Sequence, residues 1–255
     1  MNITATIQAR MSSSRLPGKI LADLCGKPML QWQIERIKRS RLIDNVVVAT
    51  TTSQADDVVE SFCLSNNYNC YRGSENDVLR RIASLLRDKN VDLHVECHGD
   101  SPLVDAQIID EFIGFYLKNK NTVDFCSSTL KTTYPPGLEV TVYPAIILIE
   151  VDNLVAVNDP MREHVGYNIS RFPNRYRLHS LEAPFPLHAP ETYLEVDTPE
   201  DLDVVRSIFG HFVSQDNCNF GLNEILFFLR KNPDYVKHNR SIERKWKRLR
   251  NERDN

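Results

Sequence analysis

Three basic residues follow the first apolar segment of the chain. The stretch QARMSSSRLPGK, residues 8–19, places Arg10, Arg15 and Lys19 around a serine run that ends in Leu-Pro-Gly. Flexible serines, exposed backbone N–H groups and three cations together can hold an anion. The stretch is not the phosphate loop of P-loop NTPases, because it lacks that motif's first glycine and its final Ser or Thr. A solvated loop whose charges bind nothing remains the alternative.

Two aspartates stand where strand-like segments end. Asp100 follows the segment HVECHG, and Asp197 follows YLEV. Acids at the carboxyl ends of strands, facing a basic loop, suit Mg²⁺, which takes one or two carboxylates plus substrate phosphates. Taken singly, Asp100 could be a turn acid before a helix, and for Asp197 an N-cap is the favoured interpretation. Together with the basic loop, the two acids favour a metal site.

The elements that position these residues alternate in the first half of the chain. Apolar patterns predict strands over 3–9, 45–51, 69–73 and 91–97, and helices over 28–40, 53–67, 75–89 and 106–119. Four strand–helix units with short connections predict a parallel sheet with helices on both faces. Ligands of such sheets lie outside the carboxyl ends of the strands. The basic loop therefore belongs to the ligand edge.

The second half of the chain is less regular. Segments 122–128, 138–144 and 175–182 look like strands with long connections, and a strand over 193–198 and a helix from 199 return to the sheet. We predict one α/β domain over 1–230 with an open, mostly parallel but mixed sheet. Its excursion over 129–190 is expected to contact an acceptor, as a lid, or to form a dimerisation arm.

Composition indicates a soluble globular protein. The 255 residues are 42% hydrophobic and 25% charged, with a net charge of −3. Six cysteines without paired spacing predict reduced, mostly buried thiols of a cytosolic protein. The chain has no 18-residue apolar stretch and no signal-peptide core, so we expect a cytoplasmic protein without an integral membrane segment.

The end of the chain is basic. Residues 231–255 carry nine Lys or Arg against four acids, which predicts a basic C-terminal helical tail. A solvated helix or a frayed end is favoured over a membrane-surface or nucleic-acid patch, so we expect no nucleic-acid partner. A narrow apolar stripe could instead dock the tail on the domain or on a second subunit.

Several ordered motifs resemble one enzyme family. Besides the opening loop they include VVVATT, YRGSENDVLRR, GDSPLVD, YPPGLEV, MREHV and EVDTPEDL, in the family's order over most of residues 3–209. The chain resembles the cytidylyltransferases that activate sugars for bacterial surface polysaccharides, in particular their spore coat (SpsF-type) branch. Relatives within this resemblance are the CMP-ketodeoxyoctulosonate and CMP-acylneuraminate synthetases. Ordered motifs over some 200 residues are more specific than any single loop.

The resemblance implies a nucleotidyltransferase fold of the glycosyltransferase-A type that binds CTP over the first loop. It implies that Arg10, Arg15 and Lys19 hold the phosphates and, with Asp100, form the catalytic set, while Asp100 and Asp197 hold Mg²⁺. RGSEND would border the base, with Gly73 and Ser74 hydrogen-bonding cytosine; a plain strand-to-helix loop capped by Ser74 is compatible with this. The implied nucleotide-binding residues are Gln8, Ala9, Arg10, Arg15, Lys19, Arg72, Gly73, Ser74 and Asp77.

The acceptor side rests on two further motifs. In MREHV, Arg162 could bind a carboxylate or phosphate bidentately, and His164 beside Glu163 could hydrogen-bond a hydroxyl. Glu139, in YPPGLEV, could contact sugar hydroxyls. The alternatives are a structural ion pair with a helix-face histidine, and an edge-strand acid. The acceptor, a sugar or a sugar acid, is therefore left open.

The implied reaction joins CTP and acceptor to a CMP- or CDP-sugar and releases pyrophosphate. Positioning and charge neutralisation are the main requirements of such a transfer. Two alternatives stay open: a glycosyltransferase that uses a ready-made nucleotide sugar, and a non-catalytic nucleotide-binding scaffold. Only the nucleotidyltransferase releases pyrophosphate from CTP. From the family's habit we also expect a homodimer.

Overall fold

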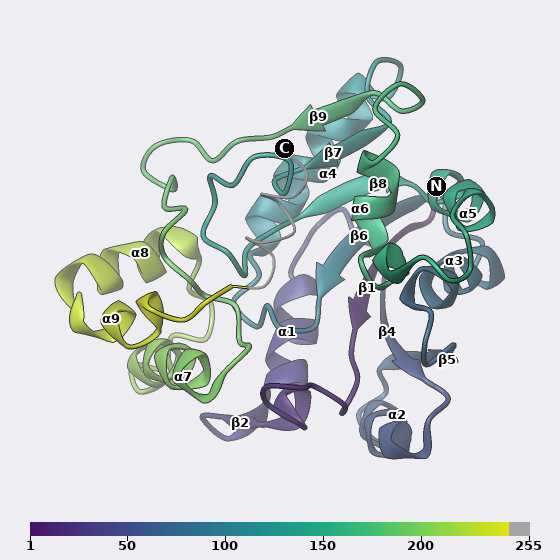
Figure 1. Cartoon of the computed structure of the whole chain (residues 1–255). Coiled ribbons are helices and arrows are strands. Elements are labelled where there is room, and N and C mark those ends of the chain that lie inside the picture. Colours follow the sequence, from purple (N-terminus) through teal and green to yellow (C-terminus); the bar gives the residue numbers. More distant parts are fainter. Residues whose placement is uncertain (245–255) are drawn as a thin grey trace.

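A seven-stranded mixed sheet forms the centre of the protein (Figure 1). The computed structural model describes residues 1–244. The strand order is β5-β4-β1-β6-β8-β7-β9, and the first four of these strands are parallel. They are β1 (Ile3–Gln8), β4 (Asn45–Thr51), β5 (Asn69–Gly73) and β6 (Leu93–His98). The predicted parallel half is confirmed.

The other half of the sheet is mixed, as predicted. It comprises β7 (Phe125–Ser127), β8 (Thr141–Pro144) and β9 (Leu178–Ser180). Strand β8 pairs antiparallel with β6 and β7, whereas β7 and β9 are parallel. Two short strands of the 129–190 excursion, β8 and β9, are thus part of the sheet itself. A separate two-stranded ribbon joins β2 (Asp23–Leu24) to β3 (Lys27–Pro28).

Helices cover both faces of the sheet. One core contains side chains of α1 (Met29–Ile37), α2 (Asp57–Ser65), α4 (Ala106–Asn119), α7 (Pro199–Val213) and α8 (Leu222–Lys231). The opposite core contains side chains of α3 (Val78–Asp88), α5 (Ala145–Leu154) and α6 (Val165–Ser170). Short 3-10 helices are η1 (Lys19–Leu21), η2 (Gln54–Asp56) and η3 (Pro160–Glu163), and α9 (Asp234–Arg240) follows α8.

Strand β4 shows why its sequence must be buried on both sides. Val46 and Val48 belong to the first core, whereas Val47 and Ala49 belong to the second. Successive side chains of a strand point to opposite faces, so a strand covered twice becomes a continuous apolar run. The run over residues 45–51 therefore specifies a central strand.

Helix α3 begins one turn later than predicted and with another cap. Asp77, not Ser74, is the N-cap, and its carboxylate accepts a hydrogen bond from the backbone N–H of Arg80. An aspartate is an effective cap because its oxygen satisfies one of the first free N–H groups of the helix. The prediction of Ser74 as the cap is wrong.

The segment 193–198 is not a strand, which corrects a second prediction. It is joined to neighbouring loops by single backbone hydrogen bonds. The N–H of Val196 donates to the carbonyl of Asp100 at 2.8 Å, and that of Leu194 donates to the carbonyl of Pro136 at 2.7 Å. Asp197 therefore follows an extended segment rather than a strand, yet it still lies beside Asp100.

The chain from α7 onward packs against the domain as far as residue 244. Asn239 and Arg244 are buried, while Arg240 is exposed. The predicted tail is thus not one solvated helix over 231–244, and its residues 245–255 lie outside the described part. The cysteines also differ from expectation: all six are free, but Cys25 and Cys218 are exposed.

The described residues contain no helix that is both long and apolar enough to cross a membrane.

Gly137 fixes the approach of two loops, which can be tested by substitution. Its φ is +99°, and a Cβ there would lie 2.4 Å from the backbone nitrogen of Glu195. We expect Gly137→Ala to destabilise the protein by at least the roughly 1–3 kcal/mol of a strained backbone position. Gly114→Ala, in the middle of α4 with no atom near the new Cβ, should instead stabilise by about 0.5–1 kcal/mol. Thermal unfolding of both variants measures this difference, and equal melting temperatures would contradict it.

Candidate active site

A cavity of about 710 Å³ lies at the carboxyl ends of β1 and β6. Parallel pairing of these strands, with Gln8 opposite His98, places both ends at the same edge. Of the fifteen predicted site residues, ten line the cavity. These are Gln8, Ala9, Arg10, Arg15, Lys19, Asp100, Glu139, Glu163, His164 and Asp197.

Lys19 joins the basic loop to both predicted metal acids. Gly18, at φ 74°, turns the chain so that Lys19 begins η1. The Lys19 Nζ lies 2.9 Å from Asp197 Oδ1, 3.9 Å from Asp100 Oδ2 and 2.7 Å from the carbonyl of Val196. Arg15 donates to the other oxygen of Asp197 at 2.5 Å. Four charged groups from three segments thus converge.

The charges around Asp197 decide its ionisation. Burial, the largest single influence, would raise the pKa of this carboxyl group, but Lys19 and Arg15 together outweigh it and hold the pKa below its usual value. Asp197 is therefore an anion at neutral pH. It does not cap α7: the N-cap is Thr198, in a capping box with Asp201. The helix after Asp100 is likewise capped by another residue, Asp105.

The two acids fit a divalent cation that is shared with substrate. Both carboxylates reach the same ammonium group, so they lie close to one point of the cavity. Residues 1–244 contain no group of three acidic, histidine or cysteine side chains that could hold a metal by themselves. Mg²⁺ commonly takes only one or two carboxylates and completes its shell with phosphates and water, so this donor set suits it.

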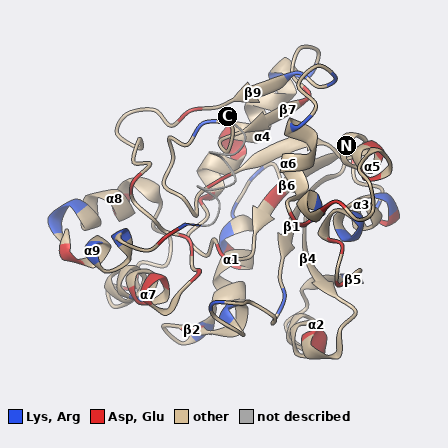
Figure 2. Ribbon diagram, in the orientation of Figure 1, with Lys and Arg blue, Asp and Glu red and all other residues tan. Residues whose placement is uncertain are grey.

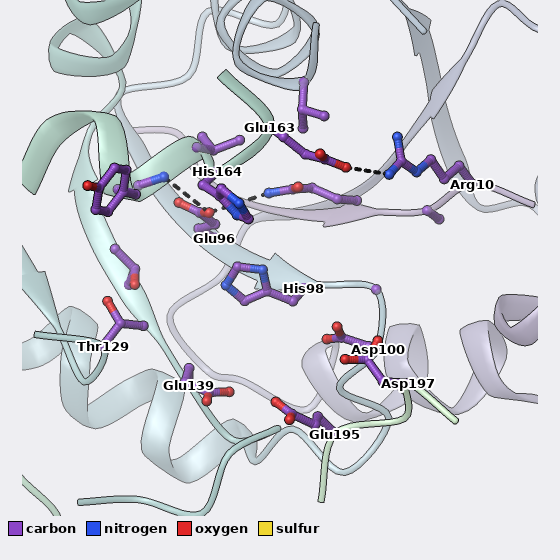
Figure 3. A pocket seen from close by; sticks show the side chains of 18 of the residues that line it. Arg10, Glu96, His98, Asp100, Thr129, Glu139, Glu163, His164, Glu195 and Asp197 are labelled. Atoms are coloured by element: carbon purple, nitrogen blue, oxygen red, sulfur yellow. Dashed lines mark hydrogen bonds and ion pairs between the residues drawn. The ribbon is translucent and has the colours of Figure 1, made fainter. Parts of the chain in front are cut away.

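Another wall of the cavity is acidic. Figure 3 shows His98 at its centre, between Glu96 on one side and Glu139 and Asp100 on the other. Burial would lower the pKa of His98, but Glu96, Asp100 and Glu139 outweigh it and raise that pKa. Burial raises the pKa of Glu139. Glu195 faces Glu139 across the same region (Figure 3). Figure 2 shows acidic segments on β6 and on loops beside it.

Arg10, Glu163 and His164 line the cavity, whereas Arg162 lies in the protein interior. Arg10 forms an ion pair with Glu163 at 2.5 Å, and burial lowers the pKa of His164 beside it. Arg162 lies elsewhere: its side chain is 3% exposed and it binds Asp77, at 2.8 Å, and Asp152. The structure therefore supports the structural ion pair for Arg162, and the prediction that it grips an acceptor finds no support in its position.

The predicted base-binding residues also lie outside the cavity lining. Arg72 binds Asp57 and Glu60, and its other donors reach backbone carbonyls of Thr51 and Ser53. Asp77 is engaged by α3 and Arg162, as described above. Arg81, a buried residue that lines the cavity, lies between the cavity and the Gly73–Ser74 loop. It donates to the carbonyl of Ser74 at 2.5 Å. Burial lowers the pKa of Arg81 to about 10.

The sequence analysis missed four charged or histidine side chains of the cavity. Glu96 and His98 are on β6, Arg81 is on α3 and Glu195 precedes Asp197. A signal existed for the first two. In HVECH the apolar positions Val95 and Cys97 belong to the core of one face, so the polar positions between them must point to the other. Arg81 gave no such signal, because a basic residue within an amphipathic helix usually lies in solvent.

Both fold and site define a class of protein. Solved structures with this fold include the synthetase of CMP:2-keto-3-deoxy-manno-octonic acid, with a TM-score of 0.59 at 17% identity over 83% of this chain and 99% of that chain. At that identity only the fold is shared. The fold is thus one that solved nucleotidyltransferases share.

The chain belongs to the cytidylyltransferase family, whose model matches residues 4–228. It is 30% identical to the spore coat polysaccharide biosynthesis protein SpsF of Bacillus subtilis over 237 residues, 91% of this chain and 96% of that protein. A cytidylyltransferase from Leptospira borgpetersenii, 28% identical, superposes with a TM-score of 0.87 over 96% of this chain and all of that chain. The protein is thus a nucleotidyltransferase enzyme, and the resemblance seen in the sequence is confirmed.

A relative of known substrate matches in part. The 3-deoxy-manno-octulosonate cytidylyltransferase of Geobacter sulfurreducens is 38% identical over 119 residues, which is 47% of each chain.

The placement of Arg162 predicts a stability effect. Arg162→Gln leaves Asp152, whose side chain is 1% exposed, without one of its two cations. Breaking a buried ion pair costs roughly 3–5 kcal/mol. Arg10→Gln is the matched control, because its more exposed pair with Glu163 should contribute less than about 1 kcal/mol. Denaturant unfolding compares the two variants. A stable Arg162→Gln protein would return Arg162 to the candidates for substrate binding.

Proposed function

We propose that the protein transfers the cytidylyl group of CTP to a sugar or sugar acid and releases pyrophosphate. The observation that carries this proposal is the convergence of Arg15, Lys19, Asp100 and Asp197 at one end of the cavity. The product, a CMP- or CDP-sugar, would serve surface polysaccharide or glycoconjugate biosynthesis. The functions of the spore coat and octulosonate relatives support this direction.

The basic loop would bind the triphosphate. Lys19 and Arg15 now bind Asp197, and phosphate oxygens would share these donors. The acceptor oxygen attacks the α-phosphorus, a new phosphorus–oxygen bond forms, and the bond to the pyrophosphate oxygen breaks. Cations near the leaving group stabilise the charge that develops on it. Arg10 would contact the phosphates after exchanging its partner Glu163.

Asp100 and Asp197 would hold Mg²⁺. When bound, the ion neutralises phosphate charge and favours departure of pyrophosphate. A backbone hydrogen bond brings the two segments together, because the Val196 N–H donates to the Asp100 carbonyl. The two acids and the ends of the chain segments that carry them would thus be held in place before substrate arrives.

The acidic wall would bind acceptor hydroxyls. Glu139 and Glu195 line the same region, and Glu96 is only 2% exposed. Carboxylates accept hydrogen bonds from several hydroxyls at once, which suits a polyhydroxylated acceptor. Glu163, at the end of η3, and His164, the C-cap of η3, would border the acceptor from the other side.

Three further expectations complete the proposal. We propose that CTP is preferred among nucleoside triphosphates, with Arg81 and the Gly73–Ser74 loop bordering the base. We also propose that the enzyme acts in the cytoplasm. The homodimer expected from the family stays a prediction.

The reaction predicts pyrophosphate release that depends on three components. We expect release from CTP with Mg²⁺ and an acceptor, drawn from a panel of sugar acids, sugar 1-phosphates and neutral sugars. Mass spectrometry then identifies the cytidylyl product. ATP and GTP should give weaker binding by calorimetry. A glycosyltransferase or a scaffold would give no pyrophosphate with any member of the panel.

If Asp100 and Asp197 both hold the metal, substitution of either one should lower turnover. Asp100→Asn and Asp197→Asn keep the side-chain shape and remove one charge. We expect turnover to fall about 100-fold for each, since one charge-matched group is typically worth on the order of 3 kcal/mol in the transition state. The Mg²⁺ concentration for half-maximal rate should rise in both variants.

A control separates this from a general charge effect. Asp203→Asn removes an exposed acid from α7, where Asp203 forms an ion pair with Arg206 at 3.6 Å. Its turnover should stay within about twofold of the parent, as expected for a surface pair. If Asp197→Asn retains full turnover and only Asp100→Asn fails, the metal site has a single protein carboxylate.

A further inference from the structure

A buried arginine lies at the end of the described chain. Arg244 is 2% exposed, and its guanidinium binds Asp201 with two hydrogen bonds, Nη1 to Oδ2 at 3.0 Å and Nη2 to Oδ1 at 2.8 Å. Asp201 itself is fully buried. Within residues 1–244, Arg244 is the only basic side chain within 4 Å of the Asp201 carboxylate. The charge of Asp201 therefore depends on Arg244.

Asp201 connects this pair to the site. Its Oδ2 accepts hydrogen bonds from the backbone N–H groups of Asp197, at 3.1 Å, and Thr198, at 3.0 Å. One carboxylate thus holds the start of α7 and the residue proposed to bind metal. A change in the position of Asp201 would be transmitted directly to the Asp197 backbone.

The segment 239–244 makes three further contacts with the segment 193–198. Arg244 Nη1 lies 3.3 Å from Glu195 Oε1, and the guanidinium carbon stacks 4.5 Å above the ring of Tyr193. Asn239 donates to the carbonyl of Tyr193 at 3.0 Å and to Asp201 at 2.9 Å. In Figure 1 the yellow segment after α9 runs from the α7–α9 corner toward the middle of the molecule.

We propose that Arg244 is a positioning residue that fixes the 193–198 segment, and with it Glu195 and Asp197, for catalysis. This proposal rests on the proposed function for the roles of those two acids. The segment 193–198 has no strand partners to hold it. It therefore needs side-chain contacts. Arg244 contacts Tyr193 and Glu195 directly and reaches Asp197 through Asp201. Groups that orient the ligands of a metal are commonly worth 10–100-fold in affinity or activity.

The position of Arg244 gives it a role in the active site despite its distance in sequence. It touches neither substrate nor the reacting atoms in this proposal; it acts through Asp201 and Glu195. Two contacts, one through Asp201 and one through Glu195, thus connect the C-terminal segment to the segment that carries the predicted metal acid.

The test compares Arg244→Gln, Arg244→Lys and a matched control, Arg240→Gln, in the full chain. Arg240 is exposed and lies four residues away. Hydrogen exchange is followed by mass spectrometry in peptides that cover 193–201 and in peptides of β1 and β4. We expect faster exchange over 193–201 in Arg244→Gln and unchanged exchange in the β1 and β4 peptides. Arg240→Gln should match the parent throughout.

Activity adds a second readout. Arg244→Gln should lower turnover by roughly 10–100-fold and raise the Mg²⁺ concentration for half-maximal rate. Arg244→Lys should recover part of both effects, because lysine keeps the charge but cannot make the two-pronged contact. The exchange measurement needs no turnover, so it decides the positioning role even if the parent protein releases no pyrophosphate.

Three results would overturn the proposal. The first is unchanged exchange over 193–201 in Arg244→Gln. The second is faster exchange that spreads equally to β1 and β4, since Arg244 would then support the whole fold. The third is loss of the folded state in both Arg244 variants, which would also mean that Arg244 supports the whole fold.

Discussion

Parallel pairing of β1 with β4 and β6 is the constraint on which the site depends. Because the three strands run in one direction, their carboxyl ends meet at one edge of the sheet. The backbone groups of a central strand are used by its neighbours on both sides, so the loops beyond these ends are the first places where side chains can face a ligand. The basic loop after β1 and the acids around β6 are brought together for this reason.

The charges of the cavity are balanced locally rather than overall. Asp197 lies between Lys19 and Arg15, and Arg10 is paired with Glu163. Each of these pairs is only partly buried, so exchanging a carboxylate for a phosphate oxygen does not require a charge to enter an apolar core. Arg162 is the opposite case. Its partner Asp152 is buried with it, whereas Asp77 is only partly buried. The pair with Asp152 resists exchange because an unpaired charge would be left in the interior.

Hydrophobic periodicity predicted the first half of the fold because the strands and helices there place apolar side chains on the faces that pack into a core. The continuous run in β4 and the amphipathic stripe of α3 correspond to the two cores directly. The same logic misled at 193–198. Leu194 and Val196 are buried in the core while Glu195 and Asp197 face the cavity. This alternation is that of a strand, but it arises here from a segment lying between a core and a cavity.

Long-range ion pairs explain most of what the sequence could not predict about the site. Nothing local to MREHV reveals that Arg162 meets Asp77, 85 residues earlier. Asp201 is likewise a plausible capping-box acid from its own neighbourhood, and it does play that role. Its second partner, Arg244, lies 43 residues later, in a stretch whose high charge suggested solvent.

The loop of the predicted metal acid is therefore held from three directions. The sheet side holds it through the bond from Val196 to Asp100, and the basic loop holds it through Lys19. The C-terminal segment holds it through Asp201. A carboxylate on an irregular segment can be placed accurately only when such contacts replace the missing strand hydrogen bonds. The cost is that residues far from the chemistry in sequence become part of what positions it, and a short segment after the last helix acquires a role that its composition does not suggest.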